Sequence, residues 1–370
     1  MQILIKNTKF MRTKVTKDLF NGQSFYVGID YHKKSWKVTI LSEHHEHKTM
    51  SQDPNPVILA NYLNRNFPGG NYHAVYEAGF SGFGACRELQ KLGVNCSVIH
   101  PADVPASQKE RQQKTDKSDS RKLARSLRSN ELEAIHIPGR RLEADRALLR
   151  QRFRIVKDIA RTKNRVKSLL LQFGISIPGR FTVSQSRHWS KNYINWLKEL
   201  PIEELSLRQV LNNYIEIGTM LRKELLLVNR QVKELSKLPE YAHNYKLLLS
   251  IPGIGIITAM TILAQIGDIK RFKRLDDLCN YIGLVPKMYA SGEKVVTGKM
   301  IRRGRKELKI MMIEASWEAI RKDPALMAVF NELSLRMNKN KAIIRIARKM
   351  LSRVRYVLTN QTEYELGIVK

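Results

Sequence analysis

The sequence predicts a mixed α/β domain followed by a larger, mainly helical part, an α/β plus α fold class. Short apolar runs rich in β-branched residues, which favour strands, recur within the first 101 residues. Helical patterns alternate with the later runs, and the sheet pattern stops after Pro101. Strands that first follow one another as a hairpin and then alternate with helices indicate a mixed sheet.

The elements of the first domain follow from local patterns. FYVGID (25–30) is typical of a buried strand, and SWKVTILSE (35–43) follows it through the turn-like YHKK, as in an antiparallel hairpin. NPVILANYLNRNF (54–66) has helical periodicity after an Asn-Pro start signal. The next segments predict a strand at 71–79, a helix at 83–93 that ends in Gly, and a strand at 95–101.

The rest of the chain is expected to be mainly helical, with helices at 115–130 and 140–167. Residues 181–240 carry heptad-like leucines, which fit either a helical hairpin or a coiled-coil contact between protomers. The chain is thus divided into a basic arm (1–24), the α/β domain (25–135), a helical or coiled-coil region (136–240), a third domain (241–335) and a basic helix and tail (336–370).

The charge balance indicates a polyanionic partner. The 370 residues include 65 Lys+Arg against 34 Asp+Glu, a formal net charge of +31, and the pI is near 10.1. No run of about 18 apolar residues predicts a membrane span, and the first 20 residues lack the apolar core of a signal peptide. The three cysteines lack CxxC spacing, which favours reduced thiols over a zinc site. We therefore expect a cytoplasmic protein that binds nucleic acid rather than a membrane.

Two segments carry the excess of positive charge. Residues 140–167 contain few acids, and a helix would align five cations on one face, beside an apolar stripe of Leu149, Phe153, Val156 and Ala160. Residues 336–358 are basic, amphipathic and free of acids. Both patterns favour phosphate binding over a solvated surface helix. The predicted contacts are Arg150, Arg154, Lys157, Arg161, Arg165, Arg345, Arg348 and Lys349.

Four carboxylates are candidates for a metal site. Asp30 and Glu77 lie at the ends of predicted strands, and Asp116 and Asp119 share a face at the start of a predicted helix. Individually, each fits a turn or a helix cap. Together at one sheet edge they would repel one another without a cation, and oxygen ligands select Mg²⁺ or Mn²⁺. This set predicts metal-assisted phosphodiester chemistry, with Asp103 as a weaker substitute ligand.

A glycine turn lies between two apolar helical patterns in LLLSIPGIGIITAMTILAQIGD (247–268). Such a helix-hairpin-helix-like turn exposes backbone N–H groups that suit a DNA phosphate, so Gly253 and Gly255 are candidate contacts. A tight turn between core helices fits the same residues.

KMYASGEKVVTGK (287–299) raises the question of a nucleophile. Ser291 lies beside a glycine and near Lys294, Lys299, Arg302 and Arg303, as a hydroxyl that attacks phosphorus would. Tyr289 is a rival, because phenolic oxygen is the better leaving group. From composition alone, a surface hairpin without catalytic function is the favoured reading of the three.

In this order, GID (28–30), YEAG (76–79), TDKSDSRKLAR (115–125), IPGIG (251–255) and GLVP…SGEK…GK (283–299) resemble the DEDD transposases of the insertion-sequence 110/1111 group. The resemblance extends from about Phe25 to Pro324. It implies a RuvC-like (RNase H-like) nuclease domain, a coiled-coil region and a C-terminal transposase domain. It also implies Mg²⁺ on the four carboxylates and Ser291 as nucleophile.

The resemblance further implies a bridge non-coding RNA that pairs with donor and target DNA, and a tetramer whose active sites combine residues of two protomers. Two segments depart from the family pattern: a serine lies between the acids in TDKSDS, and GKMIRRGRK is more basic than usual. We therefore expect an RNA-guided DNA recombinase that acts through a 5′-phosphoserine intermediate. The alternatives are a metal-dependent Holliday-junction or structure-selective nuclease and a non-enzymatic nucleic-acid-binding protein.

Overall fold

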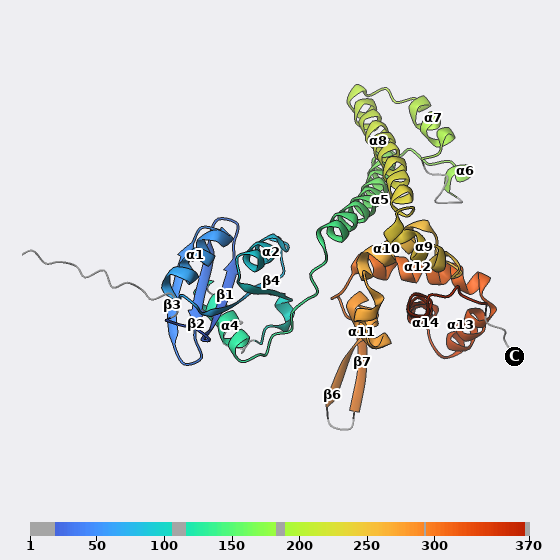
Figure 1. Ribbon diagram of the computed structural model, residues 1–370. Helices are drawn as coiled ribbons and strands as arrows, with labels where there is room; N and C mark the ends of the chain where they lie inside the picture. Colours follow the sequence, from blue (N-terminus) through green and yellow to red (C-terminus); the bar gives the residue numbers. More distant parts are fainter. Residues whose placement is uncertain (1–18, 106–115, 183–188, 292–293, 367–370) are drawn as a thin grey trace, which may run out of the picture. The chain divides into compact units, whose positions relative to one another are not determined.

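The computed structural model describes residues 19–105, 116–182, 189–291 and 294–366, and the chain divides into two compact units (Figure 1). Unit 1 is Met1–Ile137 and unit 2 is Pro138–Lys370. In the described residues, no helix is both long and apolar enough to cross a membrane.

Unit 1 is built on a five-stranded mixed sheet, which confirms the predicted mixed α/β domain. The strand order is β3-β2-β1-β4-β5; β1, β2 and β3 pair antiparallel, whereas β1, β4 and β5 are parallel. The strands are β1 (Ser24–Tyr31), β2 (Trp36–Leu41), β3 (Glu46–Gln52), β4 (Asn71–Glu77) and β5 (Asn95–Ile99). The sequence reading did not anticipate β3, because its residues EHKTMSQ contain almost no apolar alternation.

Helices cover both faces of this sheet, and strand alternation decides which side chains each helix meets. The odd-numbered residues Phe25, Val27 and Ile29 of β1 enter a core with α1 and α2, whereas Val75 of β4 packs with Leu123 of α4 on the other face. These helices and the short η1 are α1 (Pro56–Asn66), α2 (Gly84–Lys91), η1 (Pro101–Asp103) and α4 (Asp116–Arg128). Phe20, within the predicted basic arm, also packs against this core.

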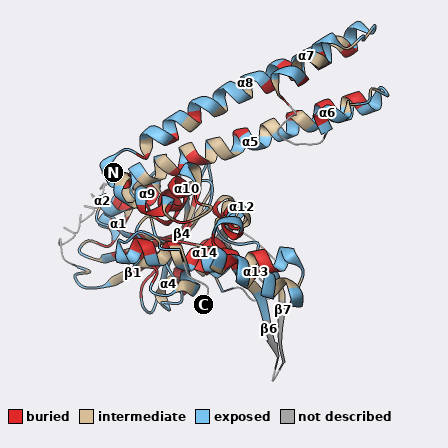
Figure 2. Ribbon diagram, turned by 90° about the vertical axis from the view of Figure 1, so that its right-hand side faces the viewer, coloured by how far each residue is buried: buried red, intermediate tan, exposed pale blue. Residues whose placement is uncertain are grey.

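Unit 2 begins with two long helices, α5 (Arg140–Gln172) and α8 (Leu205–Leu235), which lie side by side (Figure 2). The start of α5 shares a core with the end of α8, through Leu149 and Val232, and the end of α5 meets the start of α8, through Leu170 and Leu211. The pair is therefore an antiparallel helical hairpin. Two short helices, α6 (Gly179–Thr182) and α7 (Lys191–Glu199), pack near the end of α5.

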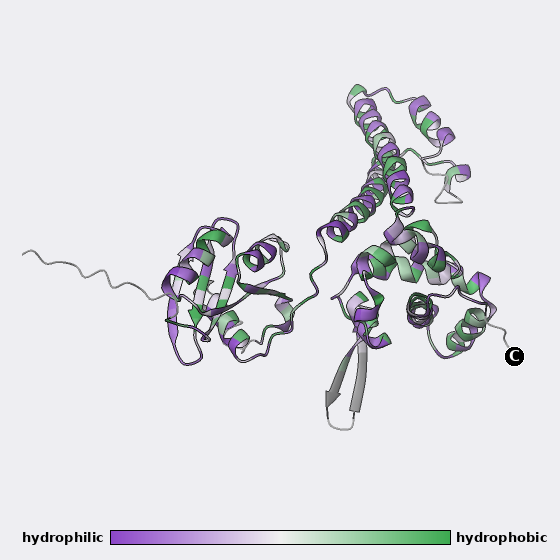
Figure 3. Cartoon of the chain, viewed as in Figure 1, coloured by the Kyte–Doolittle hydropathy of each residue, from purple (hydrophilic) through white to green (hydrophobic). Residues whose placement is uncertain are grey.

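A helical core forms the rest of unit 2, and α10 lies at its centre. Its residues from Ala259 to Ile266 are all buried, and Figure 3 shows its hydrophobic character. The surrounding elements are α9 (Pro239–Leu249), α10 (Ile256–Ile266), η3 (Ile269–Arg271), α11 (Leu275–Ile282), β6 (Pro286–Ser291), β7 (Lys294–Met300), α12 (Lys306–Lys322), α13 (Pro324–Arg336) and α14 (Lys339–Asn360).

Two sequence-based expectations change in unit 2. The stripe predicted along α5 is wrong at its second half, because Val156 and Ala160 are exposed and Ile155 and Thr162 are buried instead. The spacing from 155 to 162 is one heptad, which keeps a helix facing a partner helix. In the basic segment 336–370, α14 is an integral core helix, with Ile346, Met350 and Val354 fully buried.

Candidate active site

Two of the four predicted carboxylates end neighbouring parallel strands. β1 and β4 pair in register up to Ile29 and Tyr76, and the next residue along each strand is Asp30 and Glu77. By strand alternation, Asp30 shares a face with Gly28, and Glu77 shares a face with Val75. Both carboxylates therefore lie at one edge of the sheet, on the face that α4 covers.

Close packing fixes α4 on that face. A Cβ atom at Gly28 would overlap the Ser120 carbonyl oxygen and lie 2.5 Å from the Ala124 backbone nitrogen, so only glycine permits this approach. The hydroxyl groups of Thr39 and Ser120 are 2.9 Å apart in a buried hydrogen bond. The missing side chain at Gly28 of β1 and the Thr39 hydroxyl of β2 thus set the distance of α4 from the sheet.

The direction of α4 brings its acidic end to the carboxylate edge. At its C-terminal end, Arg128 donates to the Ser42 and Glu43 carbonyl oxygens, just beyond the end of β2. Because β2 is antiparallel to β1, this is the edge opposite Asp30. The N-terminal end of α4, with Asp116 and Asp119, therefore lies toward the edge that holds Asp30 and Glu77.

The donor set suits a hard cation in its chemistry. Carboxylate oxygens are the preferred ligands of Mg²⁺, but within the described ranges no group of three or more His, Cys, Asp or Glu side chains is arranged to hold a metal. The Asp116 side chain, the fourth member, lies outside the described residues. Sequence reasoning missed His32, whose Nε2 is 3.0 Å from Asp30 Oδ2. Its position two residues after Asp30 could have indicated this contact, because alternate residues of an extended chain lie on the same face.

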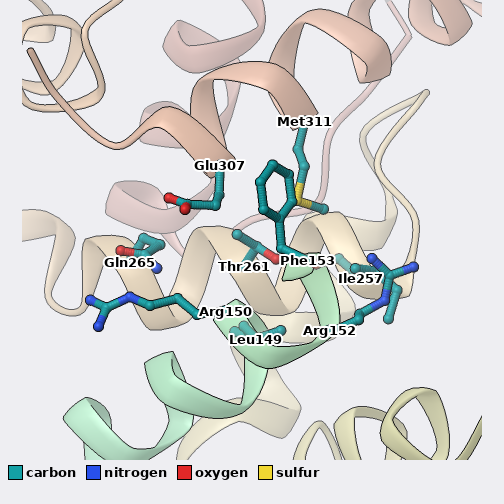
Figure 4. A pocket seen from close by; sticks show the side chains of 9 residues that line it. All are labelled: Leu149, Arg150, Arg152, Phe153, Ile257, Thr261, Gln265, Glu307 and Met311. Carbon is teal, nitrogen blue, oxygen red and sulfur yellow. Dashed lines mark hydrogen bonds between the residues drawn. The ribbon is translucent and has the colours of Figure 1, made fainter. Parts of the chain in front are cut away.

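The basic row of α5 is largely exposed. Arg154, Lys157, Arg161 and Arg165 are exposed, and Arg150 is half-buried. Figure 4 shows how the helix is seated, with Phe153 pointing toward Met311 of α12 and Arg150 extending past Gln265 of α10. The apolar side chains hold α5 on the core, and this leaves the cations of the row on its outer surface.

Two of these cations have neighbours within the helix. Arg161 donates to Asp158 at 2.7 Å, and the Lys157 ammonium lies 4.5 Å from the centre of the Phe153 ring. Exposed pairs of this kind contribute little to stability, so both cations can exchange these contacts for phosphate contacts at small cost.

The two glycines of the IPGIG turn have different roles. Gly253 has φ +84°, and a Cβ atom there would overlap the Ala315 carbonyl oxygen and lie 2.9 Å from the Ala319 nitrogen. Gly253 therefore packs against α12, as a tight turn between core helices does, and its assignment as a phosphate contact stays a prediction. Gly255 is exposed with open space around it, and it begins α10 without a side-chain cap.

The Gly253→Ala variant is expected to lower the free energy of unfolding of unit 2 by at least about 2 kcal/mol, because the new methyl group meets backbone atoms at a positive φ. Gly255→Ala, which meets nothing, should cost less than about 1 kcal/mol. Chemical denaturation measures both values. Equal stability of the two variants would contradict the packing role of Gly253.

The segment that contains the candidate nucleophile is a β-hairpin. Ser291 is the last residue of β6 and pairs with Lys294, the first residue of β7; the side chains of both lie outside the described part. Lys299, Arg302 and Arg303 are exposed. The predicted hairpin is confirmed by the antiparallel pairing of β6 and β7.

Two glycines of positive φ, Gly283 and Gly304, allow close backbone contacts at the base of the hairpin. A Cβ atom at Gly283 would overlap the Arg303 carbonyl oxygen, and one at Gly304 would lie 2.6 Å from the Ile282 carbonyl carbon. Lys309 also donates to the Ile301 carbonyl oxygen at 3.1 Å. The two ends of the hairpin thus cross at backbone contact, which fixes where it leaves the core.

The three predicted contacts on α14 differ. Arg345 and Lys349 are exposed, whereas Arg348 donates to Asp276 at 2.8 Å and to the Leu284 carbonyl oxygen at 3.2 Å. Arg348 therefore connects α14 to α11 and to the segment between α11 and β6. Its position in a basic run does not reveal this structural contact.

Two family models match the chain. Residues 245–331 match a model described as "Transposase IS116/IS110/IS902 family", and residues 27–175 match the DEDD model of IS110 proteins, described as "Transposase". The second match includes all four carboxylates, and the first includes Ser291. The class that both models name is thus that of transposases. The chain belongs to the IS110 family of insertion-sequence transposases.

Individual relatives agree with this assignment. The chain is 27% identical over 252 residues to y4qE of Sinorhizobium fredii, named as a transposase, and the match covers 65% of this chain and 57% of that protein. It is 26% identical to the transposase for insertion sequence element IS1111A of Coxiella burnetii, over 76% of each chain. A pilin gene-inverting protein of Moraxella bovis is 32% identical over 33% of this chain and 39% of its own length. The chain thus spans less than two thirds of y4qE.

Proposed function

We propose that this transposase cuts and rejoins DNA strands, with the carboxylate edge of a RuvC-like unit 1 and Ser291 of unit 2 as its catalytic groups. The shared sheet edge of Asp30 and Glu77, toward which the acidic end of α4 points, carries the proposal, because a protein of net charge +31 has no structural need to place acids at one edge. The name of the Moraxella bovis relative, a gene-inverting protein, supports rejoining as well as cutting.

In the proposed reaction, the Ser291 hydroxyl oxygen attacks the scissile phosphorus and loses its proton. The new P–O bond joins the 5′-phosphate to the serine, and the bond to the 3′ oxygen breaks, so that the departing strand takes up a proton as a free 3′-hydroxyl group. A 3′-hydroxyl of the partner strand then attacks the phosphoserine, and the serine leaves with a proton regained. One phosphodiester bond is exchanged for another, and no bond energy is lost to water.

Mg²⁺, for which Mn²⁺ can substitute, is the proposed cofactor of Asp30, Glu77, Asp116 and Asp119. When bound, such ions neutralise charge that develops on the phosphate. The residues of this chain contribute two further effects. His32 holds one Asp30 oxygen by its 3.0 Å hydrogen bond, and the close packing at Gly28 fixes the distance of α4 from β1.

Nucleic acid is proposed to lie on the exposed cations of α5 and α14 and on the uncapped start of α10 at Gly255. A bridge RNA that pairs with donor and target DNA is the proposed guide. A tetramer, in which α5 and α8 meet those of other protomers, is the proposed assembly. The exposed apolar residues Val210, Ile217, Met220 and Leu227 of α8, at spacings of seven, three and seven, support such a contact.

The proposal is tested by incubating the full chain with its flanking non-coding RNA, Mg²⁺ and labelled donor DNA, and resolving the products on a denaturing gel. A band in which the 5′ end of the DNA remains attached to protein is expected. Cleavage that yields only free 5′-phosphates would favour the nuclease, and unaltered DNA would favour a binding protein. Omitting the RNA should abolish site-specific adducts if it is the guide.

A further inference from the structure

An exposed aromatic ring lies in the loop that follows the carboxylate strand β4. Phe80 is 73% exposed, and it comes three residues after Glu77. Three residues of chain span at most about 10 Å, so the ring lies within a few nucleotides' length of the carboxylate edge. A phenylalanine this exposed contributes little to the core of unit 1.

Hydrogen bonds fix the backbone at both ends of the loop that carries this ring. At its start, the Ala78 backbone N–H donates to the Ile99 carbonyl oxygen at 2.7 Å. At its end, the buried Tyr76 hydroxyl donates to the Gly82 carbonyl oxygen at 2.9 Å, and Gly82 turns the chain with φ +60°. Because both ends are fixed, little conformational entropy remains to be lost when a ligand meets the ring.

A second ring supports Phe80 from one side. Tyr31, the last residue of β1, meets it edge to face, with ring centres 5.9 Å apart, and Tyr31 itself packs on Trp36 at 4.9 Å. The edge contact leaves the Phe80 ring largely open to solvent. Next to Tyr31, the turn into β2 carries Lys33 and Lys34, both exposed.

We propose that Phe80 is a stacking platform for one unpaired DNA base beside the scissile phosphate, with Lys33 and Lys34 on the neighbouring phosphates. Aromatic rings next to cations are how proteins hold single strands without reading their sequence. The proposal rests on the proposed function for the role of the carboxylate edge. It adds a positioning residue, because a base held on Phe80 fixes the strand across the ends of β1 and β4.

The test uses the full chain and a single-stranded oligodeoxythymidylate, at a salt concentration high enough to weaken the basic surfaces of unit 2. The wild-type protein has four tryptophans, so its fluorescence is subtracted from that of the Phe80→Trp variant. DNA should quench the remaining fluorescence, which comes from the indole at position 80. Phe80→Ala should lose about tenfold in affinity, and Phe80→Leu nearly as much, since stacking needs a ring.

Two controls separate stacking from other causes. Ile58→Ala, which removes an exposed apolar side chain of α1 in the same unit, should leave the affinity unchanged. Phe80→Ala should keep the slope of log affinity against log salt, whereas the double variant Lys33→Ala/Lys34→Ala should flatten it by about 1.4, for two phosphates of a single strand.

An equal response of the Phe80→Trp and wild-type proteins to DNA would overturn the proposal, as would equal affinities of Phe80→Ala and Ile58→Ala. These binding readouts need no strand cleavage. A protein that quenches as expected but forms no adduct would therefore refute the proposed chemistry and leave the stacking site standing.

Discussion

The Ser291→Ala variant is expected to form no covalent protein–DNA adduct, a loss of about a thousandfold or more relative to the wild-type protein. Alanine removes the only atom that would attack phosphorus and leaves the strand pairing of β6 and β7 intact, since that pairing uses backbone groups. RNA binding should be nearly unchanged. The adduct is measured on a denaturing gel with 5′-labelled DNA.

The neighbouring hydroxyls provide matched controls. Tyr289→Phe and Thr297→Ala each remove one hydroxyl from the same hairpin and should retain the adduct. Mass spectrometry of the adduct peptide should locate the DNA on residue 291. An adduct that survives Ser291→Ala but disappears in Tyr289→Phe would assign the reaction to the tyrosine instead.

The Asp30→Asn variant is expected to lower strand cleavage by at least about a hundredfold while DNA binding is kept or strengthened. The amide has the size of the carboxylate and can still bond to His32, but it removes a negative charge from the proposed metal site. A metal ion stabilises such a transition state by several kcal/mol. Each increase of about 1.36 kcal/mol in the activation barrier slows the reaction about tenfold. Binding improves because one acid fewer repels the phosphates.

Asp53→Asn is the matched control, since Asp53 is exposed in the turn before α1. It changes the net charge equally and should cleave at the wild-type rate. Isothermal titration with Mn²⁺ should show weaker metal binding for Asp30→Asn than for Asp53→Asn. Equal cleavage by the two variants would remove Asp30 from the catalytic set and would favour the non-enzymatic binding protein.

Much of the candidate site could be predicted from local sequence. Asp30 and Glu77 were found because each follows an apolar strand, and the exposed row from Arg154 to Arg165 was found because a helix repeats every 3.6 residues. Both patterns depend only on how a single element presents its side chains, so one sequence is sufficient to read them.

Other residues could not be assigned in this way, because their roles depend on a partner far along the chain. Local sequence does not reveal that Gly253 packs against α12. Nor does it reveal that Arg348 forms an ion pair with Asp276. Likewise, nothing near residue 80 in the sequence shows that Tyr31 supports the ring of Phe80.

The sequence by itself determined the mixed α/β start, the positive charge, the ordered motifs of the IS110 family and the acids of the site. Only the tertiary structure decided that Asp30 and Glu77 share the sheet face under α4, and that α4 points its acidic end toward them. The physical reason is that periodicity fixes a side chain's direction within its own element. The contact of Gly28 with Ser120, 92 residues further on, is instead fixed by which surfaces can be buried together.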